Sequence, residues 1–250
     1  MLFDMTFFAV AIPAVLFAGI SKGGFGSGGA FAATPLLALI LEPAQAVGMM
    51  LPLLTLMDFG ALKPYWKKWD AAATRALIIG SIVGIGVGAL LYKHTDPLVF
   101  KFLIGVVAVG FVLFQWARAR GMIRPAAAPM SDRAGLVAGS IAGFTSFISH
   151  AGGPPAAVYL LSRKLTKTEF QATTVIVFWA INLMKFPPYF SLGIFSWDTF
   201  TADLFLAPFA LAGVYLGVYF HKIIPEKAFF GLTYVLLLIT GSKLIWDSLV

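Results

Sequence analysis

Two glycine-rich segments hold most of the residues in this chain that can do chemistry. The first runs from Gly19 to Gly29, reads GISKGGFGSGG, and has five glycines among its last seven residues. Glycine lets backbone N–H groups approach a ligand closely, and the N–H groups and dipole of a helix start favour an anion. Ser21 and Ser27 add hydroxyl donors, and Lys22 adds the segment's only charge. This composition predicts an anion-binding site.

The alternative role for these glycines is close helix packing, which small residues promote in bilayers. Lys22 favours a functional role, because an ionisable group inside a membrane is costly unless it snorkels to the surface. No Gly-Lys-Ser/Thr follows at the spacing of a Walker motif, so nucleotide hydrolysis is unsupported. The predicted substrate contacts in this segment are Ser21, Lys22, Gly23, Gly24, Gly26, Ser27, Gly28 and Gly29.

The second segment reads TSFISHAGGPP and runs from Thr145 to Pro155. Its two glycines are expected to interrupt the helix, and its two prolines suit the first turn of a following helix. Histidine ordinarily titrates near neutral pH, so His150 is a candidate for a coupled proton, with a neutral histidine bonded to a carbonyl as the alternative. The predicted substrate contacts here are Ser146, Ser149, His150, Gly152 and Gly153.

Asp58 is a lone carboxylate in the apolar stretch Leu51–Leu62. An isolated buried carboxylate is expensive, so Asp58 is expected to pair with Lys22 or Lys63, or to take up a coupling proton. A charge near the interface or a tie between helices is the alternative.

The third apolar segment of the second half also contains polar residues. Asn182 is predicted to tie helices together. Lys185 is predicted to contact substrate, with an interfacial anchor as the alternative. Gln171, Thr173 and Thr174 are further candidates for a polar lining.

The elements that position these residues are membrane helices. Hydrophobic residues make up 60% of the 250 positions and charged residues 12%, which is about half the charge of a typical soluble domain. Stretches such as Ala76–Tyr92 and Ala228–Ile245 hold few or no charges, and about 20 apolar residues span a bilayer core. The composition therefore predicts an all-α membrane protein. The first apolar run lacks a basic start and a cleavage site, so it is expected to belong to the mature fold.

Several classes of function are excluded or disfavoured. The net charge of +7 fits basic cytoplasmic loops and does not indicate nucleic-acid binding. The chain has no cysteines, which rules out disulfides and thiolate metal sites. With three histidines and few intramembrane carboxylates, neither a metal site nor a cofactor is expected. Ser149 and His150 are sequence neighbours and make a poor catalytic dyad, so an enzyme is not predicted.

The chain resembles a duplication with an offset of 124 residues. This offset carries Gly28-Gly29 onto Gly152-Gly153, and Asp58 onto Asn182. It predicts a first repeat over 1–120, a linker over 121–131 and a second repeat over 132–250. Each half divides into five pieces, predicted at 3–21, 26–41, 44–62, 70–92 and 97–117, and at 132–148, 152–162, 168–189, 198–220 and 226–247.

In each half the first two pieces are predicted to form a glycine-broken hairpin, either re-entrant or made of two full crossings, followed by three transmembrane helices. The second piece is short, as in re-entrant segments, and broken backbone at membrane depth must be buried in protein or line a cavity. An odd number of crossings per half gathers most Lys and Arg on one side and makes the two repeats inverted in topology. By the positive-inside rule that side, with the linker, is cytoplasmic and both termini are periplasmic.

The glycine-rich break followed by Pro35-Leu36-Leu37, the Gly152-Gly153 break and the two-half layout resemble the TauE/SafE family of sulfite exporters. The resemblance covers essentially the whole chain. It implies a secondary transporter of sulfite, or of an organosulfonate such as sulfoacetate, in the bacterial inner membrane. The family's glycine-rich repeats map onto residues 19–29 and 143–155.

Several alternatives stay open beside this resemblance. They are transport of another small organic anion, an anion channel or facilitator, and a structural membrane protein. A channel predicts a continuous polar stripe, whereas the polar residues here cluster at the two breaks. The expected partners are a small anion, the lipid bilayer and a coupling proton, with a homo-oligomer left open.

Overall fold

The computed structural model describes residues 4–25, 29–123 and 128–250. Within these residues the chain is all-helical. Its ten α-helices are α1 (Met5–Ile20), α2 (Ala33–Leu37), α3 (Pro43–Tyr65), α4 (Ala71–Lys93), α5 (Pro97–Ala119), α6 (Asp132–Ser149), α7 (Gly153–Ser162), α8 (Lys167–Ser191), α9 (Trp197–Phe220) and α10 (Glu226–Leu249). A π-helical turn, Ser21–Phe25, continues α1, and a 3₁₀ turn, Ala30–Ala32, precedes α2.

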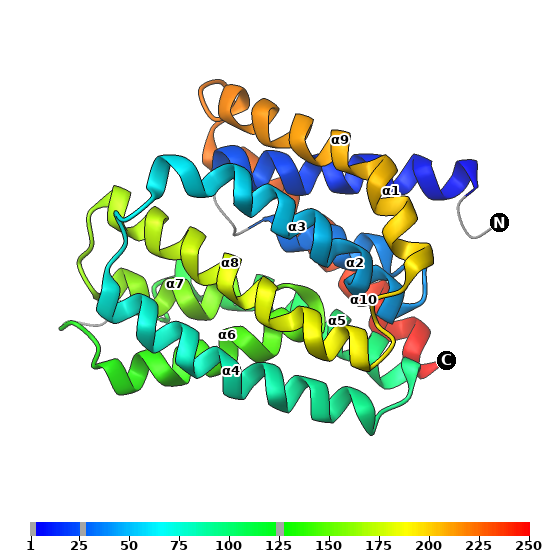
Figure 1. Cartoon of the computed structure of the whole chain (residues 1–250), viewed down its shortest axis with the longest axis horizontal. Coiled ribbons are helices and arrows are strands. Elements are labelled where there is room, and N and C mark those ends of the chain that lie inside the picture. The colour runs from blue at the N-terminus through cyan, green and yellow to red at the C-terminus, as the bar shows by residue number, and fades with distance from the viewer. Residues whose placement is uncertain (1–3, 26–28, 124–127) are drawn as a thin grey trace.

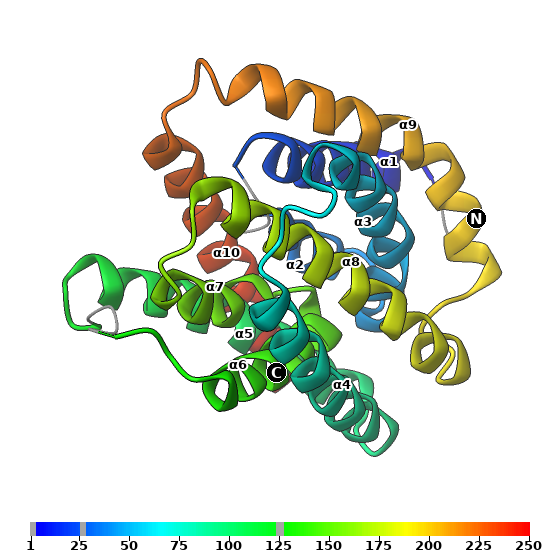
Figure 2. The same ribbon diagram turned by 60° about the vertical axis from the view of Figure 1, so that its left-hand side comes forward.

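The long helices form a bundle with its axis along the horizontal of Figure 1. Helices α1 and α9 pack together along one edge, α4 and α6 along the opposite edge, and α3 and α8 lie between them. The same neighbours stay together in the rotated view of Figure 2, and α5 packs against α10. The short helix α2 packs against α1, α3 and α10, and the short helix α7 packs against α6 and α8.

Six helical segments of the described chain are long and apolar enough to cross a membrane, which confirms a multi-pass membrane protein. They are Met5–Phe25, Pro43–Lys63, Ala71–Lys93, Pro97–Ala119, Trp197–Phe220 and Glu226–Leu249. From the sequence, α1 was predicted to be one arm of a hairpin and α8 to be a transmembrane helix. Helix α8 has 25 residues, so its length of about 37 Å would still reach across a bilayer. It falls outside the apolar set because buried polar residues, including Asn182 and Lys185, interrupt it.

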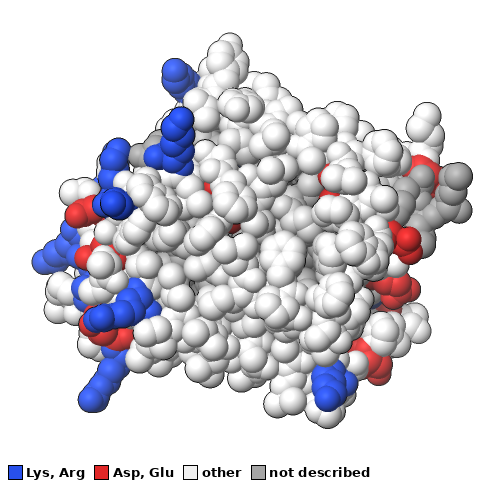
Figure 3. Space-filling view, in the orientation of Figure 1, with Lys and Arg blue, Asp and Glu red and all other residues white. Residues whose placement is uncertain are grey.

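The charged side chains divide between the two ends of the bundle. Figure 3 shows most Lys and Arg residues at the left-hand end, together with some acidic residues. The right-hand end is mostly acidic, and the start of α1 and the end of α10 lie there (Figure 1). The middle of this face shows few charged side chains (Figure 3), as expected for a surface in contact with lipid acyl chains. We call the two ends the basic end and the acidic end.

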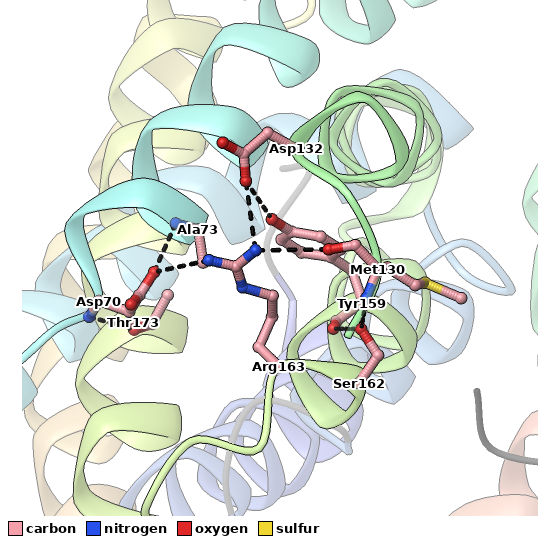
Figure 4. Close-up of polar contacts among 8 residues, drawn as sticks. All are labelled: Asp70, Ala73, Met130, Asp132, Tyr159, Ser162, Arg163 and Thr173. Atoms are coloured by element: carbon pink, nitrogen blue, oxygen red, sulfur yellow. Dashed lines mark hydrogen bonds and ion pairs between the residues drawn. The ribbon is translucent and has the colours of Figure 1, made fainter. Parts of the chain in front are cut away.

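Arg163 joins three helix ends at the basic end (Figure 4). Its guanidinium donates to the Asp132 carboxylate and to the Met130 carbonyl, both at 3.3 Å, and lies 4.0 Å from the Asp70 carboxylate. Asp70 caps the start of α4, and its backbone N–H donates to the Thr173 hydroxyl of α8 at 3.0 Å. The end of α7 is therefore tied to the starts of α4, α6 and α8.

Glycines allow the α4–α6 and α1–α9 pairs to approach at backbone distance. A Cβ added at Gly84 would overlap the Ser140 carbonyl oxygen of α6, and one added at Gly23 would overlap the Val214 carbonyl oxygen of α9. Gly80, Gly139 and Gly143 lie equally close to the facing backbone. Small residues four apart are the usual basis of close helix association in bilayers.

Gly84→Ala is expected to destabilise the protein by about 1–3 kcal/mol, the usual cost of overpacking a close contact. The matched control is Gly86→Ala on the same helix, because Gly86 is exposed and a Cβ there would meet no atom within 4 Å. Since alanine favours helix, the control should leave stability unchanged or raise it slightly. Thermal unfolding in detergent measures both variants. Equal melting temperatures would contradict the close-packing role.

Candidate functional site

The first glycine break follows α1 and its π-helical turn. The predicted helix over 26–41 is shorter than expected: the described part is the 3₁₀ turn and the five residues of α2, Ala33–Leu37. Pro35 lies inside α2 and removes one backbone donor. A helix this short has little dipole, so the predicted helix-start contribution to anion binding is weak in this half. Gly26, Ser27 and Gly28, predicted as substrate contacts, lie outside the described residues.

Lys22, just after the end of α1, is paired with Asp58 of α3 inside the bundle. Its ammonium forms an ion pair with the Asp58 carboxylate and donates to the Leu54 carbonyl at 3.1 Å. The second Asp58 oxygen accepts from the Asn182 amide of α8 at 2.7 Å. The two charged side chains are only 8% and 5% exposed, so Lys22 does not snorkel to the surface. Of the two cations considered for Asp58, the structure selects Lys22, and Asp58 and Asn182 connect α3 to α8.

The second break lies at the end of α6, where His150 takes a left-handed backbone conformation with φ of 59°. Such a conformation is unusual for a residue other than glycine, asparagine or aspartate. This backbone conformation is stabilised because both ring nitrogens of His150 have hydrogen-bond partners. Nε2 lies 2.9 Å from the Val47 carbonyl of α3, and Nδ1 lies 2.6 Å from the Lys185 ammonium of α8.

These two contacts determine the state of the His150 ring. A carbonyl oxygen can only accept, so Nε2 carries the hydrogen and Nδ1 is left to accept from Lys185. The imidazole is therefore neutral in this arrangement. A proton on Nδ1 would face the Lys185 ammonium, so this geometry disfavours a doubly protonated His150 ring.

Lys185 is fully buried, with no exposed surface, which excludes the role of an interfacial anchor. Besides His150, its ammonium donates to the carbonyl and the hydroxyl of Ser146, both at 3.1 Å, and lies 5.8 Å from the centre of the Tyr189 ring. None of the described carboxylates forms an ion pair with it. The centre of the bundle thus holds two lysines and one paired carboxylate.

A cavity of about 490 Å³ reaches Lys22 from between the helices. Lys22, Gly23 and Gly24 line it from the first break, and Gly153 from the second. Its remaining lining includes the polar residues Gln115, Arg118, Lys167, Gln171, Thr174, His221 and Glu226. Arg118 is in the last turn of α5, and Lys167 and Glu226 are the first residues of α8 and α10. The cavity therefore runs from a positively charged rim to the Lys22 ammonium.

Beyond Lys22 the space narrows to two small voids. One, of about 20 Å³, is lined from both breaks, with Lys22 on one side and Ser146, His150 and Gly153 on the other. The second, of about 10 Å³, lies beside Lys22 and Asp58. A void of this size holds about one water molecule. Lys22 borders the cavity and both voids, so it lies at the junction of the two breaks.

Several predicted site residues have structural partners instead of facing the cavity. The Ser21 hydroxyl accepts from the Gly29 backbone N–H at 3.1 Å, which braces the first break. Ser149 is buried against the Thr145 carbonyl, 3.5 Å away. A Cβ on Gly152 would lie 2.7 Å from the Ala142 carbonyl, so this glycine is required for packing. Gly23 and Gly24 serve both the α1–α9 contact and the cavity wall.

Most of the cavity rim was not predicted from the sequence. Gln115 and Arg118 are at the end of α5 and Lys167 is at the start of α8, far away in the chain, and only Gln171 and Thr174 were candidates for a lining. One signal in the sequence could have identified this rim: Gln115 is the single glutamine in the mostly apolar helix α5. Thr173, the third lining candidate, instead accepts from the Asp70 backbone. Asp203 was also missed, although it is the one carboxylate of α9 beyond the first turn and stands among apolar residues, the same signal that identified Asp58.

An all-helical membrane bundle with broken helices and a buried polar centre open to one cavity is the architecture of a membrane transporter. The profile of the sulfite exporter TauE/SafE family matches residues 11–244. The chain belongs to this family, which confirms the resemblance seen in the sequence, and its members are transporters, not enzymes. The curated proteins and the solved structures contain no significant match.

Proposed function

We propose that this protein is a secondary transporter that moves a small sulfur-containing anion, sulfite or an organosulfonate such as sulfoacetate, across the bacterial inner membrane. The main support is the charge of the buried centre. Lys22 and Lys185 are both buried there, and Asp58 is the one carboxylate paired among them. A buried cation needs a counter-charge, and a substrate anion supplies it. The sulfonate group suits such a site because three oxygens can accept from ammonium, hydroxyl and backbone donors at once.

Substrate is proposed to bind where the two breaks meet. Lys22, Gly23, Gly24 and Gly153 would receive the anion from the cavity, with Ser146 and His150 on the far side of the small void. Arg118 and Lys167 at the rim would attract anions into the cavity, because charges in a low-dielectric cleft raise the local concentration of counter-ions. Lys185 would act through Ser146 and His150.

The packing pattern supports two inverted repeats, 1–120 and 132–250, joined by the linker 121–131. Exchanging each helix for its counterpart turns the α1–α9 contact into α6–α4 and the α3–α9 contact into α8–α4, and all four contacts are present. Asp58 and Asn182, which bond to each other, are 124 residues apart, which equals the repeat offset. By the positive-inside rule we place the basic end in the cytoplasm and both termini in the periplasm.

A carrier fits better than an open channel. The cavity opens on one side of Lys22, and the voids of about 20 and 10 Å³ beyond it cannot pass an anion larger than water. Substrate can cross only if the helices around the breaks rearrange. The alternative of another small organic anion is consistent with the same charges.

The transport proposal is tested in liposomes that contain the purified protein. A gradient of sulfite or sulfoacetate should drive uptake that protein-free liposomes lack, and both anions should raise the melting temperature, because ligands that bind the folded state stabilise it. Sulfate and acetate serve as comparison anions. Flux and stabilisation by acetate alone would favour the organic-anion alternative. The absence of flux with every anion would refute the transport proposal.

A further inference from the structure

Asp203 is a buried acid that the proposed anion site does not use. It lies in α9, is only 3% exposed, and neither of its carboxyl oxygens has a hydrogen-bond partner in the described structure. An ionised carboxylate in such surroundings would be strongly destabilising, whereas a neutral carboxylic acid is tolerated. We propose that Asp203 is a proton-binding site and holds its proton in the conformation seen here.

Asp203 is better suited to hold a proton than the residues first considered for coupling. Both carboxylate oxygens of Asp58 are already engaged, one by Lys22 and the other by Asn182. His150 accepts from Lys185 through Nδ1, which opposes a second proton. A metal cation would need several oxygen ligands, and the described residues contain no group of acidic or histidine side chains around Asp203. The proton is the ligand that a single isolated carboxylate can bind.

Helices α1 and α3 and the turn Ser21–Phe25 pack against α9. The titratable groups that they and their caps carry are Asp4, Lys22, Glu42, Asp58, Lys63 and Tyr65, and α9 itself carries Asp198, Tyr215 and Tyr219, with His221 at its end. None of these groups forms a described hydrogen bond or ion pair with Asp203. Lys22 and Asp58 are engaged with each other, and Asp4 caps α1. Among the described residues, Asp203 thus has neither a hydrogen-bond donor nor an ion-pair partner.

The position of Asp203 along α9 separates it from the anion cavity. Gly23 of the first break packs against Val214, which lies about 16 Å beyond Asp203 along α9, toward the basic end. Asp203 is about 9 Å from the helix start at Trp197, on the side of the acidic end. Pro208 lies between Asp203 and Val214 on α9. It has no backbone N–H, so one hydrogen bond of the helix is missing, and helices commonly bend at such a position. Bending there would bring water to Asp203 as the cavity closes, which would couple proton release to transport.

The protonation of Asp203 is tested directly by infrared spectroscopy of the protein in bilayers at neutral pH. A protonated carboxylic acid has a carbonyl stretch that a carboxylate lacks. This band should be present in the wild type and in the control Asp198→Asn, an exposed aspartate of the same helix, and absent in Asp203→Asn. An unchanged band in Asp203→Asn would overturn the proposal. If that variant fails to fold, Asp203→Glu must shift the band, and an unshifted band would overturn it equally.

The coupling role rests on the transport function proposed above and has its own measurement. Liposomes with a pH-sensitive dye should report proton movement with sulfite in the wild type and in Asp198→Asn, and none in Asp203→Asn. Sulfite flux with the same proton movement in Asp203→Asn would refute coupling through Asp203 while leaving transport intact. A wild type that moves no anion would refute the transport function and, with it, the coupling, whereas the infrared band decides protonation in either case.

Discussion

Lys22→Met is expected to lower the free energy of unfolding by about 3–5 kcal/mol, because it leaves the Asp58 carboxylate buried without its cation. The same change should abolish stabilisation by sulfite, since Lys22 borders the cavity and both voids at the junction of the breaks. Denaturant or thermal unfolding in detergent, with and without sulfite, measures both effects. Lys243→Met is the control, because that lysine pairs with Asp247 at the surface, where ion pairs contribute about 0–1 kcal/mol.

A second substitution separates the two effects of losing Lys22. Asp58→Asn in the Lys22→Met background removes the orphaned charge without changing the shape of the side chain. This double variant should recover most of the lost stability, because no unpaired charge remains buried. It should still fail to bind sulfite. Normal sulfite binding by the double variant would show that Lys22 serves Asp58 alone and does not contact substrate.

Lys185→Met is expected to have the opposite effect on stability. Lys185 is fully buried, and its described partners are the neutral groups of Ser146 and His150. Methionine has nearly the same length and avoids the cost of burying a charge, so the unfolding free energy should stay the same or rise by about 1–4 kcal/mol. Sulfite binding should weaken at least tenfold, because the centre loses one of its two cations.

Lys185→Met is expected to keep or raise stability because Lys185 has no described counter-ion, and His150→Gly is the control variant. Glycine adopts the left-handed backbone of position 150 without steric cost, so this variant removes the imidazole and keeps the turn. It should destabilise the protein, because Lys185 loses a hydrogen-bond acceptor while remaining buried. A loss of stability in Lys185→Met as large as that in Lys22→Met would show that Lys185 has a charged partner and would contradict the argument.

Most helix boundaries could be predicted because their signals are local. Asp70, Asp96, Ser131, Thr166 and Ser196 each accept a backbone N–H of the first turn of a helix, and each stands just before an apolar run. The long predicted pieces therefore lie within a few residues of the observed helices. The exception is 26–41, where α2 spans only Ala33–Leu37. Apolar composition alone could not reveal that the regular α-helix in this segment is only five residues long and is preceded by a 3₁₀ turn.

Composition, spacing and the glycine motifs were enough to predict a multi-pass helical membrane protein of the sulfite exporter family, with a lysine and a histidine in two glycine breaks. The side-chain partners depend on how the helices pack: Asp58 meets Lys22, 36 residues away, and Asn182, 124 residues away, and His150 meets Val47 from 103 residues away. The packing also leaves both carboxyl oxygens of Asp203 without a hydrogen-bond partner among the described residues. The physical reason is that hydrophobic periodicity specifies a helix and its apolar face, whereas the depth and rotation at which two helices pack depend on side-chain fit across the whole bundle.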